Sequence, residues 1–172
     1  ATPSIILILD EYSKRLCKSR RLLKIEGVAY LSFYLRKLNL EKLVEINLKN
    51  KKYLDEFVDE GNGKLIKAQG RGIACHWIAG NVYTLAIYST FQSIIAKSSN
   101  IVRVPEKSID IVLKLLELLD NIQVFYNNAM YSSKDILKNI ALVYFSSKDE
   151  ILNKSMSIIA DSRIIWGGKE AV

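Results

Sequence analysis

The chain has 172 residues and a formal net charge of +7, with 49% hydrophobic and 25% charged residues. These values are typical of a soluble globular protein about the size of one domain. No run approaches ~18 consecutive apolar residues, which excludes a transmembrane helix. The apolar start has no positive segment before it, so we expect no signal peptide and a cytoplasmic location. Two cysteines, Cys17 and Cys75, are too few for a disulfide framework.

The positive charge is concentrated in the first third of the chain. Residues 1–54 hold 12 Lys and Arg against 5 Asp and Glu, whereas residues 55–172 hold 13 of each. A basic segment of this kind could meet nucleic acid, a phosphate-bearing ligand or an acidic protein surface. The alternative is a solvated helix face. The basic residues are spread among Leu and Ile at helical spacing, which favours that alternative.

Residues 5–60 are predicted to be helical because their apolar residues recur every three or four positions. The pattern breaks near Asn39, and Gly61-Asn62-Gly63 is typical of a turn or loop. The apolar stripe consists of Val28, Leu31, Leu35 and Leu38 before the break and Leu43, Ile46, Leu54 and Phe57 after it.

After residue 61 the pattern changes to short apolar runs, each followed by a helical segment. Strands are predicted at 72–78, 100–104, 122–126, 140–145 and 163–166. Helices are predicted at 84–97, 108–120, 133–138 and 148–160, with Ser108 as a capping residue and Pro105 ending the strand before it. Such alternation predicts an α/β fold with a parallel sheet, and continuous apolar strands favour a sheet covered on both faces.

Polar pairs interrupt the chain where three of these strands end. They are Gly80-Asn81, Pro105-Glu106 and Gly167-Gly168. In an open parallel sheet the ligand crevice lies outside the carboxyl ends of the strands. The three pairs therefore predict a binding site at one edge of the sheet, although each could also be a plain turn.

Two of these interruptions suggest a nucleotide. The glycines at 167 and 168 would let the backbone approach a phosphate or a nicotinamide, and Glu106 with Arg103 could bind ribose and phosphate. The alternatives are an ordinary turn and an exposed ion pair. Neither GxGxxG nor a Walker A sequence is present, so the usual nucleotide fingerprints are missing.

The single histidine and the two cysteines give no clear catalytic signal. His76 has no second His nearby and cannot form a usual zinc site, so we predict a core histidine bonded to the backbone, with a catalytic role as the alternative. Cys75 lies in the same predicted strand and should be inert. Cys17, beside Lys18, has no base partner, and we assign neither cysteine as a nucleophile.

Three stretches, GIACHWIAGNV, SSNIVRVPE and ADSRIIWGGKEAV, resemble in this order the LuxC-type acyl-CoA reductases. These are the fatty-acid reductase subunits of bacterial bioluminescence and their relatives, a branch of the aldehyde dehydrogenase superfamily. The resemblance implies a Rossmann-like cofactor domain joined to a catalytic domain with a cysteine nucleophile. It also implies that acyl-CoA acylates that cysteine and that a hydride from NADPH then releases the fatty aldehyde.

The resemblance also implies roles for individual residues. Asn81 would stabilise the thiohemiacetal oxyanion. Arg103 occupies the position where aldehyde dehydrogenases usually have a lysine. Lys169 occupies the position where many of them have a phosphate-binding serine. Glu106 would disfavour a 2′-phosphate, which leaves NADH open beside NADPH. The cofactor-binding residues implied are Arg103, Glu106, Trp166, Gly167, Gly168 and Val172.

In the superfamily the nucleophilic cysteine follows the turn that WGGKEAV resembles. We therefore expect a helical segment at 1–60, a partial Rossmann-like cofactor-binding domain at 61–172 and no catalytic domain. The chain would then be the amino-terminal part of a longer enzyme and would be inactive by itself. Implied partners are a fatty acyl-CoA or acyl-protein donor, acyl-protein synthetase and acyl-transferase subunits, and further copies of the chain. The alternative function is a non-catalytic interaction module with a basic helical face; a nucleic-acid-binding protein ranks third.

Overall fold

The computed structural model describes residues 1–80 and 82–167. Its first third is helical, as predicted, although the chain breaks at Leu35-Arg36 and not near Asn39. None of the described helices is both long and apolar enough to span a bilayer. The helices are α1 (Thr2–Lys18), α2 (Val28–Tyr34) and α3 (Lys37–Leu48), with short 3-10 turns at η1 (Leu22–Lys24) and η2 (Lys51–Leu54).

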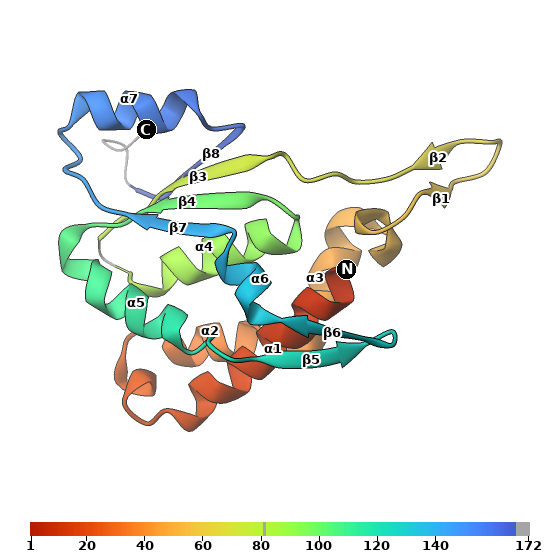
Figure 1. The fold of residues 1–172 in the computed structure, drawn as a ribbon, viewed down its shortest axis with the longest axis horizontal. Helices are drawn as coiled ribbons and strands as arrows, with labels where there is room; N and C mark the ends of the chain where they lie inside the picture. Colours follow the sequence, from red (N-terminus) through yellow and green to blue (C-terminus); the bar gives the residue numbers. More distant parts are fainter. Residues whose placement is uncertain (81, 168–172) are drawn as a thin grey trace.

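A four-stranded parallel sheet follows, which confirms the α/β class (Figure 1). The strand order is β7-β4-β3-β8. In this register His76 lies opposite Val102 on one side and Ile164 on the other. The strands are β3 (Ile73–Trp77), β4 (Ser99–Arg103), β7 (Ile140–Val143) and β8 (Ser162–Ile165).

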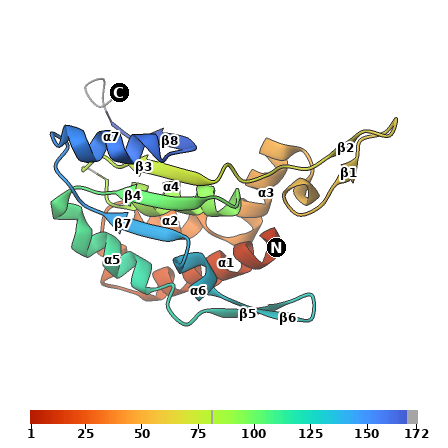
Figure 2. The same cartoon turned by 45° about the horizontal axis from the view of Figure 1, so that its top comes forward.

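Helices cover the two faces of this sheet unequally. Helix α4 (Thr84–Ile95) and helix α5 (Ile109–Glu117) lie on one side, with the amino-terminal helices beyond them, whereas α7 (Glu150–Ile158) lies on the other (Figure 2). Ser108 precedes α5, after the 3-10 turn η3 (Glu106–Ser108), but its side chain makes no capping hydrogen bond. The predicted cap is therefore wrong, and the hydroxyl is buried without a partner among the described residues.

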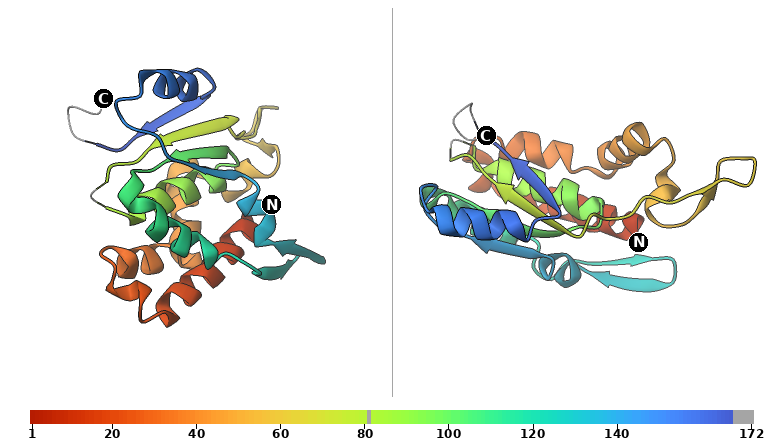
Figure 3. Two further views of the ribbon diagram at one scale, coloured as in Figure 1. Left: turned by 60° about the vertical axis from the view of Figure 1, so that its left-hand side comes forward. Right: turned by 90° about the horizontal axis from the view of Figure 1, so that it is seen from above.

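The prediction that residues 122–126 form a strand of the parallel sheet is wrong. Strand β5 (Gln123–Tyr126) instead pairs antiparallel with β6 (Ala129–Ser132), and α6 (Ser133–Leu137) follows. Asn127 and Asn128 turn the chain with φ of 51° and 60°, the geometry that tight hairpins need. A second small hairpin joins β1 (Val58–Asp59) to β2 (Leu65–Ile66), and both hairpins extend beyond the amino ends of the parallel strands (Figure 3).

The core links the helical segment to the sheet. Leu9, Tyr12 and Leu16 of α1 are fully buried, and the ring of Tyr12 meets that of Phe91 on α4 edge-on at 5.2 Å between centroids. The same apolar cluster continues to Val102 in β4. Burial of such side chains contributes about 1.5–3 kcal/mol each. Residues from both sides of position 60 share this core. The division of the chain into two domains at residue 60 stays a prediction.

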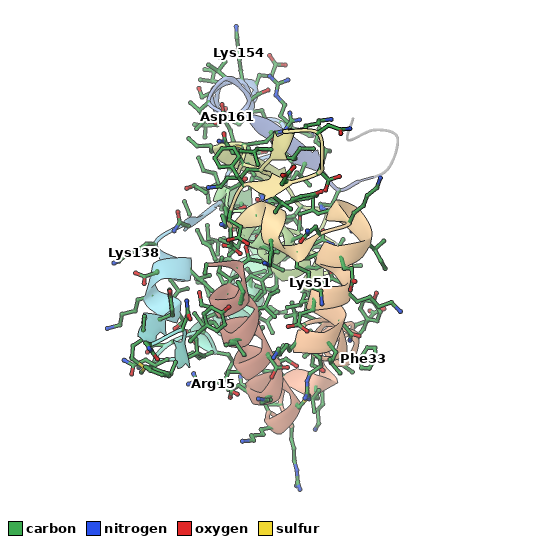
Figure 4. The ribbon with its side chains drawn as sticks, turned by 90° about the vertical axis from the view of Figure 1, so that its right-hand side faces the viewer. Arg15, Phe33, Lys51, Lys138, Lys154 and Asp161 are labelled. Carbon is green, nitrogen blue, oxygen red and sulfur yellow. The ribbon has the colours of Figure 1, made fainter. Side chains whose placement is uncertain are left out.

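Polar contacts also tie α1 to the rest of the molecule. The guanidinium of Arg15 reaches the segment that leads into β5 and donates to the carbonyl oxygens of Leu118, Asp120 and Asn121 (Figure 4). These carbonyls lie at the end of α5, where backbone acceptors lack helical partners. Arg15 therefore acts as a cap for a helix more than 100 positions away.

The connections place a reversal of strand order at β3. The chain runs from β3 through α4 to β4, then to β7, and returns through α7 to add β8 on the other side of β3. The helices before and after the reversal lie on opposite faces of the sheet. Crevices that bind ligands occur at the carboxyl ends of the strands at such a reversal.

Candidate functional site

A cleft of about 500 Å³ opens at this reversal. Its walls come from the segments that follow three strands: β3, β4 and β8. Leu85 of the first turn of α4 also lines the cleft, and the amino end of a helix favours negative charge. The residues that line the cleft are Ala79, Gly80, Val82, Leu85, Lys107, Trp166 and Gly167.

Gly80 allows two of these segments to approach closely. A Cβ atom at this position would lie 3.0 Å from Cε of Lys107 and 3.1 Å from Cγ of Pro105. The lysine chain can move aside, but the proline ring is held by its own backbone. A larger residue would therefore push the turn after β3 away from the turn after β4 and change the cleft.

Lys107 is an exposed cation in the cleft wall that the sequence analysis did not single out. It directly follows Glu106 at the end of β4, and this adjacency is the signal that could have identified it. Together with the start of α4 it makes the cleft attractive to an anion, and a phosphate group is the ligand such a combination suits.

Arg103 and Glu106 lie beside the cleft, at the carboxyl ends of β4 and β7. Arg103 donates from Nε and Nη2 to the carbonyl of Phe145, at 3.2 and 2.9 Å, and burial lowers the pKa of its guanidinium. Glu106 accepts a hydrogen bond of 3.1 Å from the Tyr144 hydroxyl, which raises the pKa of that tyrosine. In the described part of the chain the two residues use these other partners and do not form the ion pair considered as an alternative.

Trp166, at the end of β8, forms one wall of the cleft and is half-buried. Its ring meets Tyr88 of α4 edge-on, with centroids 6.3 Å apart. Its indole Nε1 donates to Oγ of Ser89 at 3.0 Å. Gly167 continues the wall, whereas Asn81, Gly168 and Val172 lie outside the described residues.

His76 is fully buried in β3 on the α4 side of the sheet. Its ring nitrogens bond to Ser89 Oγ at 2.8 Å and to Asn100 Oδ1 at 2.9 Å. The prediction of a core histidine is confirmed, but its expected backbone partner is wrong, because both partners are side chains. Burial lowers the pKa of the imidazole, although the bond to Asn100 opposes the shift.

Neither cysteine is placed for nucleophilic chemistry in this cleft. Cys75 is buried in β3, and burial raises the pKa of its thiol. Cys17 is exposed, near the end of α1, and belongs to none of the segments that line the cleft.

The basic surface of the first third is partly neutralised within the chain. Five of its basic residues form ion pairs with nearby carboxylates, and most of these pairs are exposed, where each contributes little to stability. The paired residues are Lys14, Arg36, Lys37, Lys51 and Lys52.

Comparison with known proteins identifies the family to which the chain belongs. The family profile described as acyl-CoA reductase (LuxC) matches residues 7–172. The chain is 26% identical over 174 aligned positions to long-chain acyl-protein thioester reductase 2 of Photobacterium leiognathi, covering 95% of this chain and 34% of that protein. It is 27% identical over 141 positions to long-chain acyl-protein thioester reductase of Aliivibrio fischeri, covering 77% of this chain and 26% of that protein.

The chain thus spans about a third and about a quarter of the length of these two relatives. The family profile, by contrast, matches almost every residue of the chain, including the segments that build the cleft. The chain belongs to the LuxC family of acyl-CoA reductases.

Proposed function

We propose that this chain forms the cofactor-binding part of a fatty acyl reductase that uses NADPH. The observation that carries the proposal is the cleft at the reversal of strand order, lined by Gly80, Lys107 and the Trp166-Gly167 turn in a member of the LuxC family. In the complete enzyme, a fatty acyl group transferred to a cysteine would be reduced to the aldehyde by the hydride that the nicotinamide supplies.

Each residue around the cleft has a role in this proposal. Trp166 offers the face of its indole to a planar ring, and Lys107 meets a phosphate. Glu106 accepts from ribose hydroxyls, and Nη1 of Arg103, which has no partner among the described residues, donates to ribose or phosphate. The two cations favour NADPH, and NADH is the alternative because Glu106 would repel a 2′-phosphate. Asn81 is proposed as the donor to the thiohemiacetal oxyanion.

The nucleophile is proposed to be neither Cys17 nor Cys75. Cys17 belongs to none of the segments that line the cleft, and Cys75 is buried with a raised pKa. Without another thiol, the 172-residue chain binds cofactor but reduces no acyl thioester. A fatty acyl-CoA or acyl-protein donor, acyl-protein synthetase and acyl-transferase partners, self-association and a cytoplasmic location belong to the same proposal.

Calorimetric titration of the chain with NADPH, and separately with NADH, tests the cofactor assignment. We expect saturable binding that Lys107→Ala weakens about tenfold, or about 1.4 kcal/mol, for either cofactor. Glu106→Ala should weaken binding by the same factor for NADH, whose free 2′-hydroxyl can donate to the carboxylate. Glu60→Ala is the matched control, since Glu60 is an exposed carboxylate of the β1–β2 hairpin at the opposite end of the sheet. Binding that both cleft variants leave unchanged, or no binding by either the chain or the complete enzyme, would overturn the assignment.

A further inference from the structure

The proposed function gives no role to a fully buried ionisable group in β3. His76 is the chain's one histidine, has no exposed surface and lines neither the cleft nor a metal site among the described residues. Both its nitrogens bond to other side chains, whereas most side-chain hydrogen bonds in proteins go to the backbone or to water. One of these partners, Ser89, is in turn hydrogen-bonded to Trp166 in the cleft wall.

The direction of each hydrogen bond in this group can be deduced. Asn100 Nδ2 donates to the carbonyls of Ser98 at 2.9 Å and Asn139 at 3.3 Å, so its Oδ1 must face His76. The imidazole therefore carries its proton on Nε2, donates it to Oδ1 of Asn100, and leaves Nδ1 as an acceptor.

With Nδ1 as an acceptor, the Ser89 hydroxyl donates its proton to His76. The oxygen of Ser89 is then left to accept, and the group that donates to it is the indole N–H of Trp166. An indole N–H can only donate. The four side chains form one ordered chain of donors from Trp166 through Ser89 and His76 to Asn100.

These hydrogen bonds connect two strands, a helix and the segment that follows a third strand. Asn100 lies in β4, His76 in β3, Ser89 in α4 and Trp166 just after β8. Ser89, His76 and Asn100 are at most 2% exposed, whereas Trp166 is half-buried and reaches the cleft. The buried end is thus fixed by the core of the sheet, and the other end is a wall of the proposed cofactor site.

We propose that His76 and Ser89 are positioning residues that hold the Trp166 indole in the orientation that shapes the cleft. The inference rests on the proposed function for its ligand, a nicotinamide nucleotide. Neither residue touches that ligand. His76 and Ser89 act by holding the Trp166 indole in one orientation before the ligand binds, so that ligand binding does not have to immobilise the ring. Ordering one large side chain on binding weakens affinity by roughly 2- to 10-fold.

The first test observes Trp166 directly and needs no ligand. The chain has two tryptophans, so Trp77→Phe leaves Trp166 as the sole indole. In this background Ser89→Ala should raise the hydrogen-exchange rate of the indole N–H at least ~10-fold and increase acrylamide quenching of its fluorescence. Ser89→Thr, which keeps the hydroxyl, should restore most of the protection.

Ser93→Ala is the matched control. Ser93 is also buried on α4, one helical turn after Ser89, but its hydroxyl forms no hydrogen bond with Trp166 or His76 in the described part of the chain. It should leave indole exchange unchanged. His76→Gln should reproduce part of the increase in indole exchange caused by Ser89→Ala. If the His76→Gln variant does not fold, the comparison of Ser89→Ala with Ser93→Ala still tests the positioning role. Equal exchange in Ser89→Ala and Ser93→Ala would overturn the positioning role.

The second test asks whether the effect on ligand passes through Trp166. NADPH affinity is measured by calorimetry for Ser89→Ala, Trp166→Phe and the double variant. We expect each single variant to weaken binding about 5-fold, and the double variant to bind no more weakly than Trp166→Phe alone. Multiplicative losses would mean that Ser89 acts independently of Trp166 and would overturn the inference. If the parent chain binds no nucleotide, the proposed function fails, while the exchange experiment still judges the positioning role.

Discussion

The two faces of the parallel sheet are packed very differently. On one face, α4 buries nine of its residues between the strands and α1. On the other, α7 buries Met156 alone among its nine residues, and Ile151 and Ile158 are 78% and 72% exposed. Lys154 of α7 points away from the sheet (Figure 4). The molecule thus has a thick, closely packed side and a thin one.

This difference in packing indicates which side of the sheet holds the candidate site in place. His76, Ser89 and Trp166 all belong to the α4 side, so the cleft wall is fixed from the thick side of the sheet. On the α7 side, Trp77 Nε1 donates to Asn153 Oδ1 at 2.9 Å, and this contact is only partly buried. Three sets of measurements test the contrast between the two faces.

The largest effect is expected in the core of the α4 side. Phe91 is fully buried against Tyr12, so Phe91→Ala should lower the free energy of unfolding by about 3–5 kcal/mol through the cavity it leaves. Ile158→Ala on α7 removes an exposed side chain and should cost less than about 0.5 kcal/mol. Urea unfolding followed by circular dichroism measures both. Similar losses in the two variants would contradict the contrast.

The next effect concerns pH. Burial holds the pKa of His76 below its ordinary 6.5, so the unfolded chain takes up this proton at a higher pH than the folded one. This contribution to stability is complete above pH 6.5 and is lost as the pH falls below it, by up to about 1.4 kcal/mol per unit. Urea unfolding between pH 7.5 and 5.5 should show this slope.

His76→Gln is the comparison for the pH measurement. Because the chain has no other histidine, and ordinary carboxyl groups titrate near pH 4, the variant should have a nearly flat stability between pH 7.5 and 5.5. A slope that persists in the variant would mean that another group is responsible.

The smallest effect should appear on the thin side. Asp149 caps α7, with its carboxylate accepting from the backbone N–H of Leu152 at 2.9 Å. Asp149→Ala should reduce stability by about 1 kcal/mol and speed amide exchange in α7 before that in α4. Asp149→Asn, which keeps an acceptor, should recover most of the loss. Amide exchange that changes equally in both helices would show that α7 is as firmly packed as α4.

Much of this fold could be predicted because local patterns agreed with the tertiary environment. The strands at 73–77, 99–103, 140–143 and 162–165 each lie within a residue or two of their predicted positions. The strand at 123–126 is the exception. It is as rich in apolar residues as the others but ends at Asn127-Asn128, whose positive φ values form a tight hairpin. Two adjacent asparagines before a second alternating run were the available signal.

The candidate site was predicted only in part. Strand-end position was enough to indicate Trp166, Gly167 and Gly80, which do line one cleft. The hydrogen-bonded group behind Trp166 could not be predicted, since its members are separated by 13, 24 and 77 positions and their pairing depends on strand order. A periodic pattern reports which face a residue occupies, but not which residue faces it from another element.

The position of β8 after the other three described strands of the parallel sheet has a consequence for how the site forms. During synthesis β3, α4, β4 and β7 leave the ribosome before Trp166 does. The hydrogen bond between Ser89 and the Trp166 indole can form only after another 77 residues have been added. Closure of such long-range contacts is slow compared with helix formation. We therefore expect the cleft to form late in folding, after the part of the core that α1, α4 and β4 share.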